Sequence, residues 1–157
     1  MKKLAVIYSK YSPTVDAIKY NLQQYQVDCF CKKIDNTSSY DLIVLVNCHD
    51  KNNTNTLRCH HSLLPAFDSD EPERDAILAG AKVSGITILQ NNEIIAQYPV
   101  FITSDMHYED LKQELNYLEQ TIYPIVIEKV LNNEPLELKT LLGKNNCCQG
   151  GCLGCTH

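Results

Sequence analysis

A chain of 157 residues is long enough to bury one hydrophobic core and fits a single main domain. Its formal net charge of −5 gives no support for nucleic acid as a partner. The first apolar run, residues 4–8, is too short for a signal-peptide core or a membrane-spanning helix. We therefore expect a cytoplasmic protein with neither nucleic acid nor a membrane as partner.

The first half of the chain carries three strand patterns and one helix pattern. Residues 4–8 predict a buried parallel strand, residues 27–34 alternate as a second strand does, and residues 42–46 form the clearest central strand. Between the first two, Ser12 and Pro13 are typical of the N-cap and first residue of a helix.

The second half predicts a helix, a hairpin and a long helix. The helix runs from about residue 72 to 79, with Asp68 or Ser69 as its cap and a solvated face that includes Glu73. Residues 83–89 and 94–100 are strands joined at two asparagines. The last helix is expected to begin after Ser104 or Asp105 and to continue beyond a proline, because its apolar period continues.

These patterns predict a three-layer, Rossmann-like α/β domain over residues 1–138 with a mostly parallel central sheet. The chain has no Gly-x-Gly-x-x-Gly segment, which argues against a dinucleotide. Ligands of open α/β sheets bind beyond the carboxyl ends of the strands. Asn47 and His49 follow the central strand, so we expect both to bind a small-molecule ligand, with His60 returning to the same edge.

The segment from Arg58 to Phe67 joins two histidines to a Ser-Leu-Leu-Pro turn. A histidine side chain is well suited to move protons near neutral pH. Pro65 restricts its own φ and disfavours helix at Leu64, so the turn should be stiff. The segment could hold an imidazole at a cleft, or it could be a structural turn with two surface histidines.

This segment resembles the Asn-x-His-x-Ser-Leu-Leu-Pro signature of formyltransferases that use 10-formyltetrahydrofolate. The resemblance is good over residues 40–138 and loose over residues 1–35, and residues 76–80, 85–88, 94–97 and 119–124 follow in the family's order. The member types that this chain resembles are phosphoribosylglycinamide formyltransferase and formyltetrahydrofolate deformylase. The doubled histidine of this chain is more similar to the deformylase. The resemblance implies the formyltransferase fold over residues 1–138.

The resemblance also implies the catalytic residues. Family members use a histidine flanked by an asparagine and an aspartate to polarise the formyl carbonyl and to move protons. His60 aligns with that histidine, Arg58 stands where the asparagine should be, and the loop that carries the aspartate is missing. Glu93 is the one carboxylate in the shortened hairpin and could substitute. The expected ligand-binding residues are Asn47, His49, His61, Ser62, Leu64 and Pro65.

Several functions therefore stay open. The first is formyl transfer from 10-formyltetrahydrofolate to an amine, in purine or one-carbon metabolism, and a variant of it is hydrolysis of the formylated folate. The family's glycine- and serine-rich phosphate-binding loop is also missing, and residues 9–12 take its place. The alternative is a non-catalytic protein that uses the cleft for a ligand and its tail as a metal or redox element.

The tail differs from the rest of the chain. A polar linker, residues 139–146, precedes residues 147–157, which hold four of the eight cysteines. Closely spaced thiolates predict zinc or an iron–sulfur cluster, and the tail is also similar to the oxidoreductase-like domain. A redox-active or disordered tail, or one that contacts a protein partner, is the alternative. The predicted metal ligands are Cys147, Cys148, Cys152 and Cys155.

Overall fold

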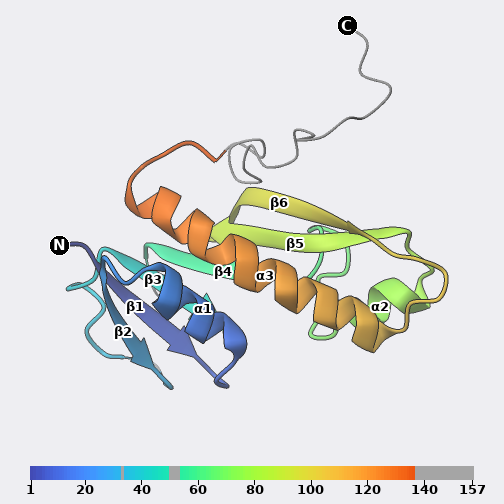
Figure 1. Ribbon diagram of the computed structural model, residues 1–157, viewed down its shortest axis with the longest axis horizontal. Helices are drawn as coiled ribbons and strands as arrows, with labels where there is room; N and C mark the ends of the chain where they lie inside the picture. Colours follow the sequence, from blue (N-terminus) through green and yellow to red (C-terminus); the bar gives the residue numbers. More distant parts are fainter. Residues whose placement is uncertain (33, 50–53, 137–157) are drawn as a thin grey trace, which may run out of the picture.

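The structure is a computed structural model that describes residues 1–32, 34–49 and 54–136. These residues form one six-stranded sheet with three helices (Figure 1). None of the described helices is long and apolar enough to cross a membrane. The elements are β1 (Lys3–Tyr8), α1 (Pro13–Asn21), β2 (Gln26–Phe30), β3 (Leu42–Val46), β4 (Thr56–His60), α2 (Pro72–Leu78), β5 (Val83–Gln90), β6 (Glu93–Phe101) and α3 (Tyr108–Leu131).

The sheet has the strand order β2-β1-β3-β4-β5-β6. The pairs β1–β2, β1–β3 and β3–β4 are parallel, whereas β4–β5 and β5–β6 are antiparallel. Asn91 and Asn92 join β5 to β6 with φ angles of 51° and 65°, the left-handed conformation that a two-residue hairpin turn requires. The mostly parallel sheet, the inner position of β3 and the hairpin are confirmed.

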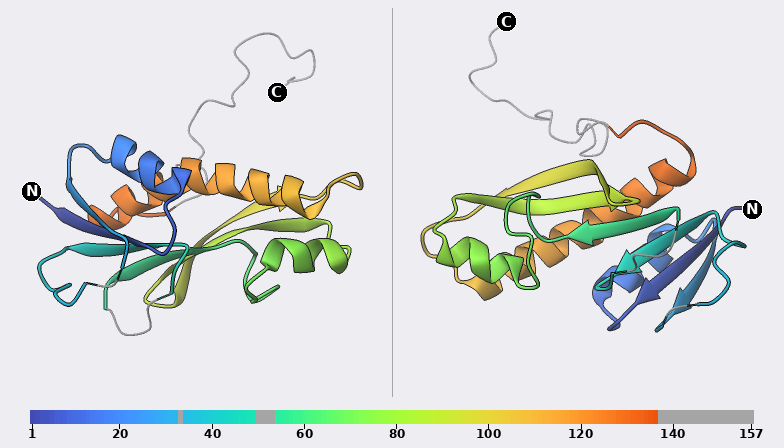
Figure 2. Two further views of the ribbon diagram at one scale, coloured as in Figure 1. Left: turned by 90° about the horizontal axis from the view of Figure 1, so that it is seen from below. Right: turned by 180° about the vertical axis from the view of Figure 1, so that it is seen from behind.

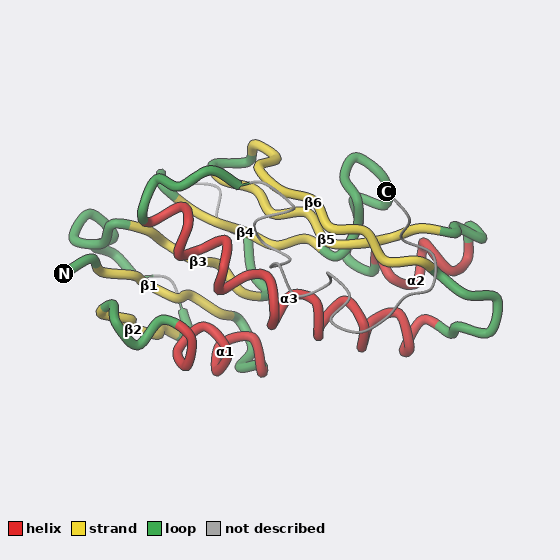
Figure 3. The backbone as a smooth tube through the Cα atoms, turned by 45° about the horizontal axis from the view of Figure 1, so that its top comes forward, coloured by secondary structure: helices red, strands yellow, loops and turns green. Residues whose placement is uncertain are grey.

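Two helices cover one face of the sheet. Figure 2 shows α1 and α3 side by side on that face. Figure 3 shows α3 as the longest helix, extending from α2 at one end to the neighbourhood of α1. Each large apolar side chain buried beneath the two helices contributes about 1.5–3 kcal/mol of transfer free energy. The buried side chains of α3 are Leu111, Leu115, Glu119, Ile122, Tyr123, Pro124, Val126, Ile127 and Leu131.

The opposite face of β1 and β3 has a smaller core. Ala5, Ile7, Ile43 and Leu45 are buried there. In the part of the chain that the structure describes, the side chains against this cluster come from β2 and from loops, so loops rather than a helix form the third layer at this point. These covering side chains are Phe30, Ile34, Tyr40 and Cys48.

Three element boundaries differ from the predicted ones. Strand β2 ends at Phe30, four residues before the predicted end at 34. Helix α2 has Glu71 as its N-cap, rather than Asp68 or Ser69. Helix α3 begins at Tyr108 because His107 and Asp110 form a capping box, in which the backbone N–H of His107 donates to the Asp110 carboxylate at 2.9 Å.

Two other predictions concern the last helix and the tail, and the structure tests only the first. Helix α3 does continue past Pro124, to Leu131. The linker and the cysteine-rich tail, residues 139–157, lie outside the described residues, so metal binding by the four tail cysteines stays a prediction.

Candidate functional site

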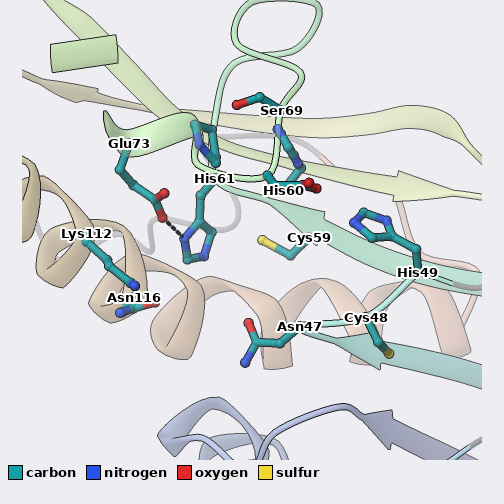
Figure 4. Close-up of a pocket in the computed structure, with 12 residues that line it drawn as sticks. Asn47, Cys48, His49, Cys59, His60, His61, Ser69, Glu73, Lys112 and Asn116 are labelled. Atoms are coloured by element: carbon teal, nitrogen blue, oxygen red, sulfur yellow. Dashed lines mark hydrogen bonds and ion pairs between the residues drawn. The ribbon is translucent and has the colours of Figure 1, made fainter. Parts of the chain in front are cut away.

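A pocket of about 380 Å³ lies beyond the carboxyl ends of β3 and β4 (Figure 4). Asn47 and His49 reach it from the segment after β3, and His60 from the end of β4. Asn47 has a φ of 54°, a conformation that asparagine tolerates better than most residues, and it turns the chain out of the sheet. Parallel neighbouring strands thus bring these three side chains together, at the edge where the topology predicts a ligand.

Strand alternation decides which side chains of β4 face α3. Leu57 is fully buried in the core on that face, and Cys59, two positions on, packs against the same core. His61 follows the strand and reaches Glu119 on α3. His60 lies between them in sequence and is buried, at 8% exposure. The doubled histidine therefore places its two imidazoles in different surroundings.

The loop after His61 is fixed to the β5–β6 hairpin. The Thr87 hydroxyl donates to the carbonyl of Ser62 at 2.6 Å and accepts from the backbone N–H of Leu64 at 3.0 Å. The Gln97 amide donates to the carbonyl of Leu64 at 2.9 Å. Within the loop, the Ser62 hydroxyl donates to the carbonyl of Ala66 at 2.6 Å. These bonds hold the backbone that carries the histidines in one position.

The predicted ligand residues of this loop have structural roles. The Ser62 side chain is completely buried and its hydroxyl is used within the loop. Leu64 is half-buried and Pro65 is exposed; a cis peptide bond joins them, and neither is among the residues that line the pocket. Hydrogen bonds from Thr87 on β5 and Gln97 on β6 hold this turn, and its predicted stiffness stays a prediction.

His60 is oriented by one hydrogen bond. Its Nε2 lies 3.2 Å from the carbonyl oxygen of Phe67, and because a carbonyl can only accept, Nε2 carries the hydrogen. In the neutral ring, Nδ1 is then the acceptor. Nearby, burial first and the positive charge of Arg58 second lower the pKa of His49 below its ordinary value, so His49 is mainly neutral at pH 7.

His61 lies between two carboxylates. Its Nδ1 is 2.7 Å from Glu73 and its Nε2 is 2.9 Å from Glu119 (Figure 4 shows the first contact). Burial disfavours the charged imidazole, but the hydrogen bonds to Glu119 and Glu73 outweigh it and raise the pKa of His61 to about 9. Burial would raise the pKa of Glu73, but the hydrogen bond to His61 lowers it below its ordinary value.

Half-buried Cys59 lies beside His61 and Glu119. Burial, together with the neighbouring Glu119 carboxylate, raises the pKa of the Cys59 thiol well above its ordinary value. The thiol therefore carries its proton at neutral pH, unless a cation compensates the thiolate.

Two predicted catalytic residues lie apart from the pocket lining. Arg58 is half-buried on β4, one residue before Cys59. Glu93 begins β6 and pairs with Gln90, which pairs with Leu57, three positions before His60. At about 3.3 Å per residue along a strand, Glu93 is displaced by about 10 Å from the level of His60. The structure does not bring the Glu93 carboxylate to the pocket.

Among the lining or neighbouring residues that were not foreseen, four bring a charged or amide group to the histidines. Glu73 was predicted on a solvated helix face, and this is wrong, since Glu73 is 8% exposed and pairs with His61. Glu119 had a detectable signal, because it lies four residues after Leu115 and before Tyr123 on the buried stripe of α3. Lys112 and Asn116 add one cation and one amide from α3. An acidic residue on the apolar stripe of α3 is a sequence signal that could have identified this side of the pocket.

The arrangement is that of an α/β protein with a pocket, lined by His49, His60 and His61, at the carboxyl edge of a mostly parallel sheet. The sequence matches the family described as Formyl transferase over residues 3–127, which is most of the chain. The chain therefore belongs to the formyl transferase family, and the resemblance of its Ser-Leu-Leu-Pro segment is confirmed.

Two curated relatives show where the chain stands. It is 36% identical over 81 residues to the phosphoribosylglycinamide formyltransferase of Bacillus subtilis (strain 168), across 48% of this chain and 42% of that protein. It is 28% identical over 120 residues to the methionyl-tRNA formyltransferase of Protochlamydia amoebophila (strain UWE25), across 73% of this chain and 36% of that protein. The chain thus spans less than half the length of either relative.

Solved structures agree on the fold. The glycinamide ribonucleotide transformylase 1 of Symbiobacterium toebii has a TM-score of 0.71 at 20% identity, covering 85% of this chain and 89% of that one. The phosphoribosylglycinamide formyltransferase of Bacillus halodurans has a TM-score of 0.68 at 21% identity, covering 88% and 100%. At these identities the likeness establishes the formyltransferase fold.

Proposed function

We propose that this protein transfers a formyl group from 10-formyltetrahydrofolate to an amine, with His60 as the acid–base residue. The observation that carries the proposal is the position of His60: it lies in the signature segment at the pocket, held by the Phe67 carbonyl through Nε2. Because Nε2 is used in this bond, Nδ1 is the ring nitrogen left to accept a proton, which is what a general base needs.

The proposed reaction conserves atoms and charge. The nitrogen of the acceptor amine attacks the formyl carbon, and the amine proton passes to His60. The bond between the formyl carbon and the folate nitrogen then breaks, and His60 returns the proton to that nitrogen. The products are a formylated amine and tetrahydrofolate, and the histidine is regenerated.

Arg58 is proposed to stabilise the oxyanion in place of the family's asparagine. A guanidinium is always charged and donates through a planar fork of N–H groups, so it can serve a developing negative oxygen. Arg58 does not line the pocket, but its positive charge contributes to lowering the pKa of His49, and this supports an electrostatic role for Arg58 at the pocket. We leave Glu93 out of the proposed catalytic group because of its place in the hairpin.

A specific observation favours a second candidate, in which the protein binds a ligand without catalysing transfer. Glu73 and Glu119, whose carboxylates bond a pocket histidine, bond His61 rather than His60. Such a protein could bind a folate or amine through Asn47 and His49, with no turnover. Hydrolysis of the formylated folate is the intermediate case, in which water takes the place of the amine.

The test is an assay of formyl transfer with 10-formyltetrahydrofolate and glycinamide ribonucleotide, with hydrolysis followed in the same reaction. His60→Gln should lower kcat by at least about 100-fold, the usual size of a lost acid–base contribution. His49→Gln, at the same pocket, should raise KM and leave kcat within about threefold. Saturable ligand binding without turnover by the wild type would establish the second candidate instead.

Two further expectations from the sequence stay proposals. We propose a cytoplasmic location, supported by the family's use of a folate as the formyl donor. We also propose that the tail cysteines bind zinc or an iron–sulfur cluster, supported by four thiols within residues 147–155.

A further inference from the structure

We propose that Cys59, His61 and Glu119 together bind one divalent transition-metal ion, zinc by the chemistry of its ligands, in the wall of the pocket. One possible ligand atom from each side chain lies within 4.8 Å of those of the other two. The three come from β4, the segment after it and α3, so the fold itself brings them together. This site is separate from the cysteines of the tail and does not use His60.

The ligand types select the ion. A thiolate, an imidazole and a carboxylate are ligands that zinc accepts, whereas magnesium and calcium require oxygen ligands throughout. Ligands about 2.0–2.3 Å from a tetrahedral zinc lie about 3.5 Å from one another. His61 Nε2 and Glu119 Oε2 are 2.9 Å apart, so a small adjustment of these side chains and of the thiol would complete the site.

Glu73 supplies the support that a metal-binding histidine normally has. Metal-bound imidazoles usually donate their other ring N–H to a carboxylate, which fixes the ring and makes it a stronger ligand. Glu73 accepts from Nδ1 of His61 at 2.7 Å, on the opposite side of the ring from Glu119. The tautomer that this bond requires leaves the Nε2 lone pair directed to the side where Glu119 lies.

Charge favours a cation at the same place. Two buried carboxylates face one imidazole, and a buried charge without compensation is costly. Lys112 lines the pocket and offsets part of this negative charge. When the ion binds, the Cys59 thiol and the doubly protonated His61 ring each release one proton to solvent, and the divalent charge replaces them.

The proposed site faces the pocket. Cys59 and His61 both line it, and Figure 4 shows the Cys59 sulfur directed toward the His61 ring. With three protein ligands, a tetrahedral ion keeps one position for water or another small ligand, the arrangement of zinc sites that react rather than of purely structural ones. Without a metal ion, the His61 ring directs one N–H to each carboxylate, and this state gives a different experimental result.

The test uses the full chain in a background where Cys147, Cys148, Cys152 and Cys155 are replaced by serine, so that the tail cannot contribute thiolates. After chelator treatment, the protein is titrated with zinc or cobalt(II). We expect one equivalent of either ion, and with cobalt the visible bands of a tetrahedral site together with a thiolate charge-transfer band. Cys59→Ser should abolish the charge-transfer band and weaken binding at least about tenfold.

Matched variants separate binding from folding and from catalysis. Cys29→Ser, a half-buried cysteine of β2 outside the group, should bind as the background protein does. His60→Gln should also keep the metal, so loss of formyl transfer and loss of metal can be told apart. If the Glu119→Gln protein does not fold, X-ray absorption of the zinc-loaded background protein identifies the ligands instead. We expect one sulfur and two protein nitrogen or oxygen ligands. No bound equivalent, or a Cys59→Ser protein that binds like the background, would overturn the proposal.

Discussion

Replacing Tyr123 by phenylalanine removes a hydroxyl that joins α3 to the two strands carrying the pocket. The hydroxyl lies 2.9 Å from the carbonyl of Leu45 on β3 and 3.0 Å from that of Leu57 on β4. The last residue pair between β3 and β4 is Leu45 with Arg58. The hydroxyl therefore bonds carbonyls near the end of the β3–β4 pairing. Burial raises the pKa of Tyr123 well above its ordinary value, so the hydroxyl keeps its proton and donates.

The expected cost follows from burial. Tyr123 is completely buried, and in the variant the two carbonyls lose their shared donor without gaining water. Leaving buried polar groups without a partner costs about 1–3 kcal/mol. For a chain of this size each kcal/mol lowers Tm by about 2–4 °C, so a loss of about 2 kcal/mol predicts a fall of about 4–8 °C.

Urea unfolding measures this directly. Tyr123→Phe should lower the midpoint without changing the m-value, because the folded state keeps its buried surface. Tyr117→Phe on the same helix is the control: Tyr117 is 72% exposed, and its variant should match the wild type. Equal midpoints for Tyr123→Phe and the wild type would refute the reasoning, and so would equal losses in the two variants.

Two further predictions concern the hairpin and the tail. A Cβ at Gly85 would lie 2.1 Å from the backbone oxygen of Tyr98 and 2.7 Å from the Leu63 side chain, so Gly85→Ala should cost about 3 kcal/mol, the upper part of the range for overpacking, measured by urea unfolding. An unchanged midpoint would contradict this close approach. Deleting residues from Lys144 onward should remove the tail's metal and leave Tm of the α/β domain nearly unchanged, measured by metal analysis and calorimetry. If the truncated protein kept the metal-to-protein ratio of the full chain, the tail would bind no metal and all the ligands would lie elsewhere.

The sequence predicted the sheet well because its signals are local. Five consecutive apolar residues in β3 indicate an inner strand, and two adjacent asparagines form a hairpin turn at positive φ. The meeting of Asn47, His49 and His60 followed from a topological rule about parallel strands, not from any contact visible in the sequence. These predictions needed no knowledge of how distant side chains pair.

The missed parts of the site depend on distant partners. Glu119 is 58 residues from His61, and Glu73 is 12 residues from it, so neither ion pair has a local pattern. The first turn of α2 is charged, which is typical of a solvated helix end, yet α2 packs against α3 and Glu73 is buried. The displacement of Glu93 became visible only when the register of β4, β5 and β6 was fixed.

The two-residue turn at Asn91 and Asn92 also has a consequence for the order in which the protein folds. Its two strands pair over residues that are close in sequence, so the hairpin can form on the microsecond scale. The parallel strands must first close longer loops and should add more slowly. Thr87 and Gln97 belong to this early hairpin, and they hold the loop that follows the histidines. We therefore expect the frame of the pocket to assemble from its hairpin side, with β4 and its histidines added to an existing template.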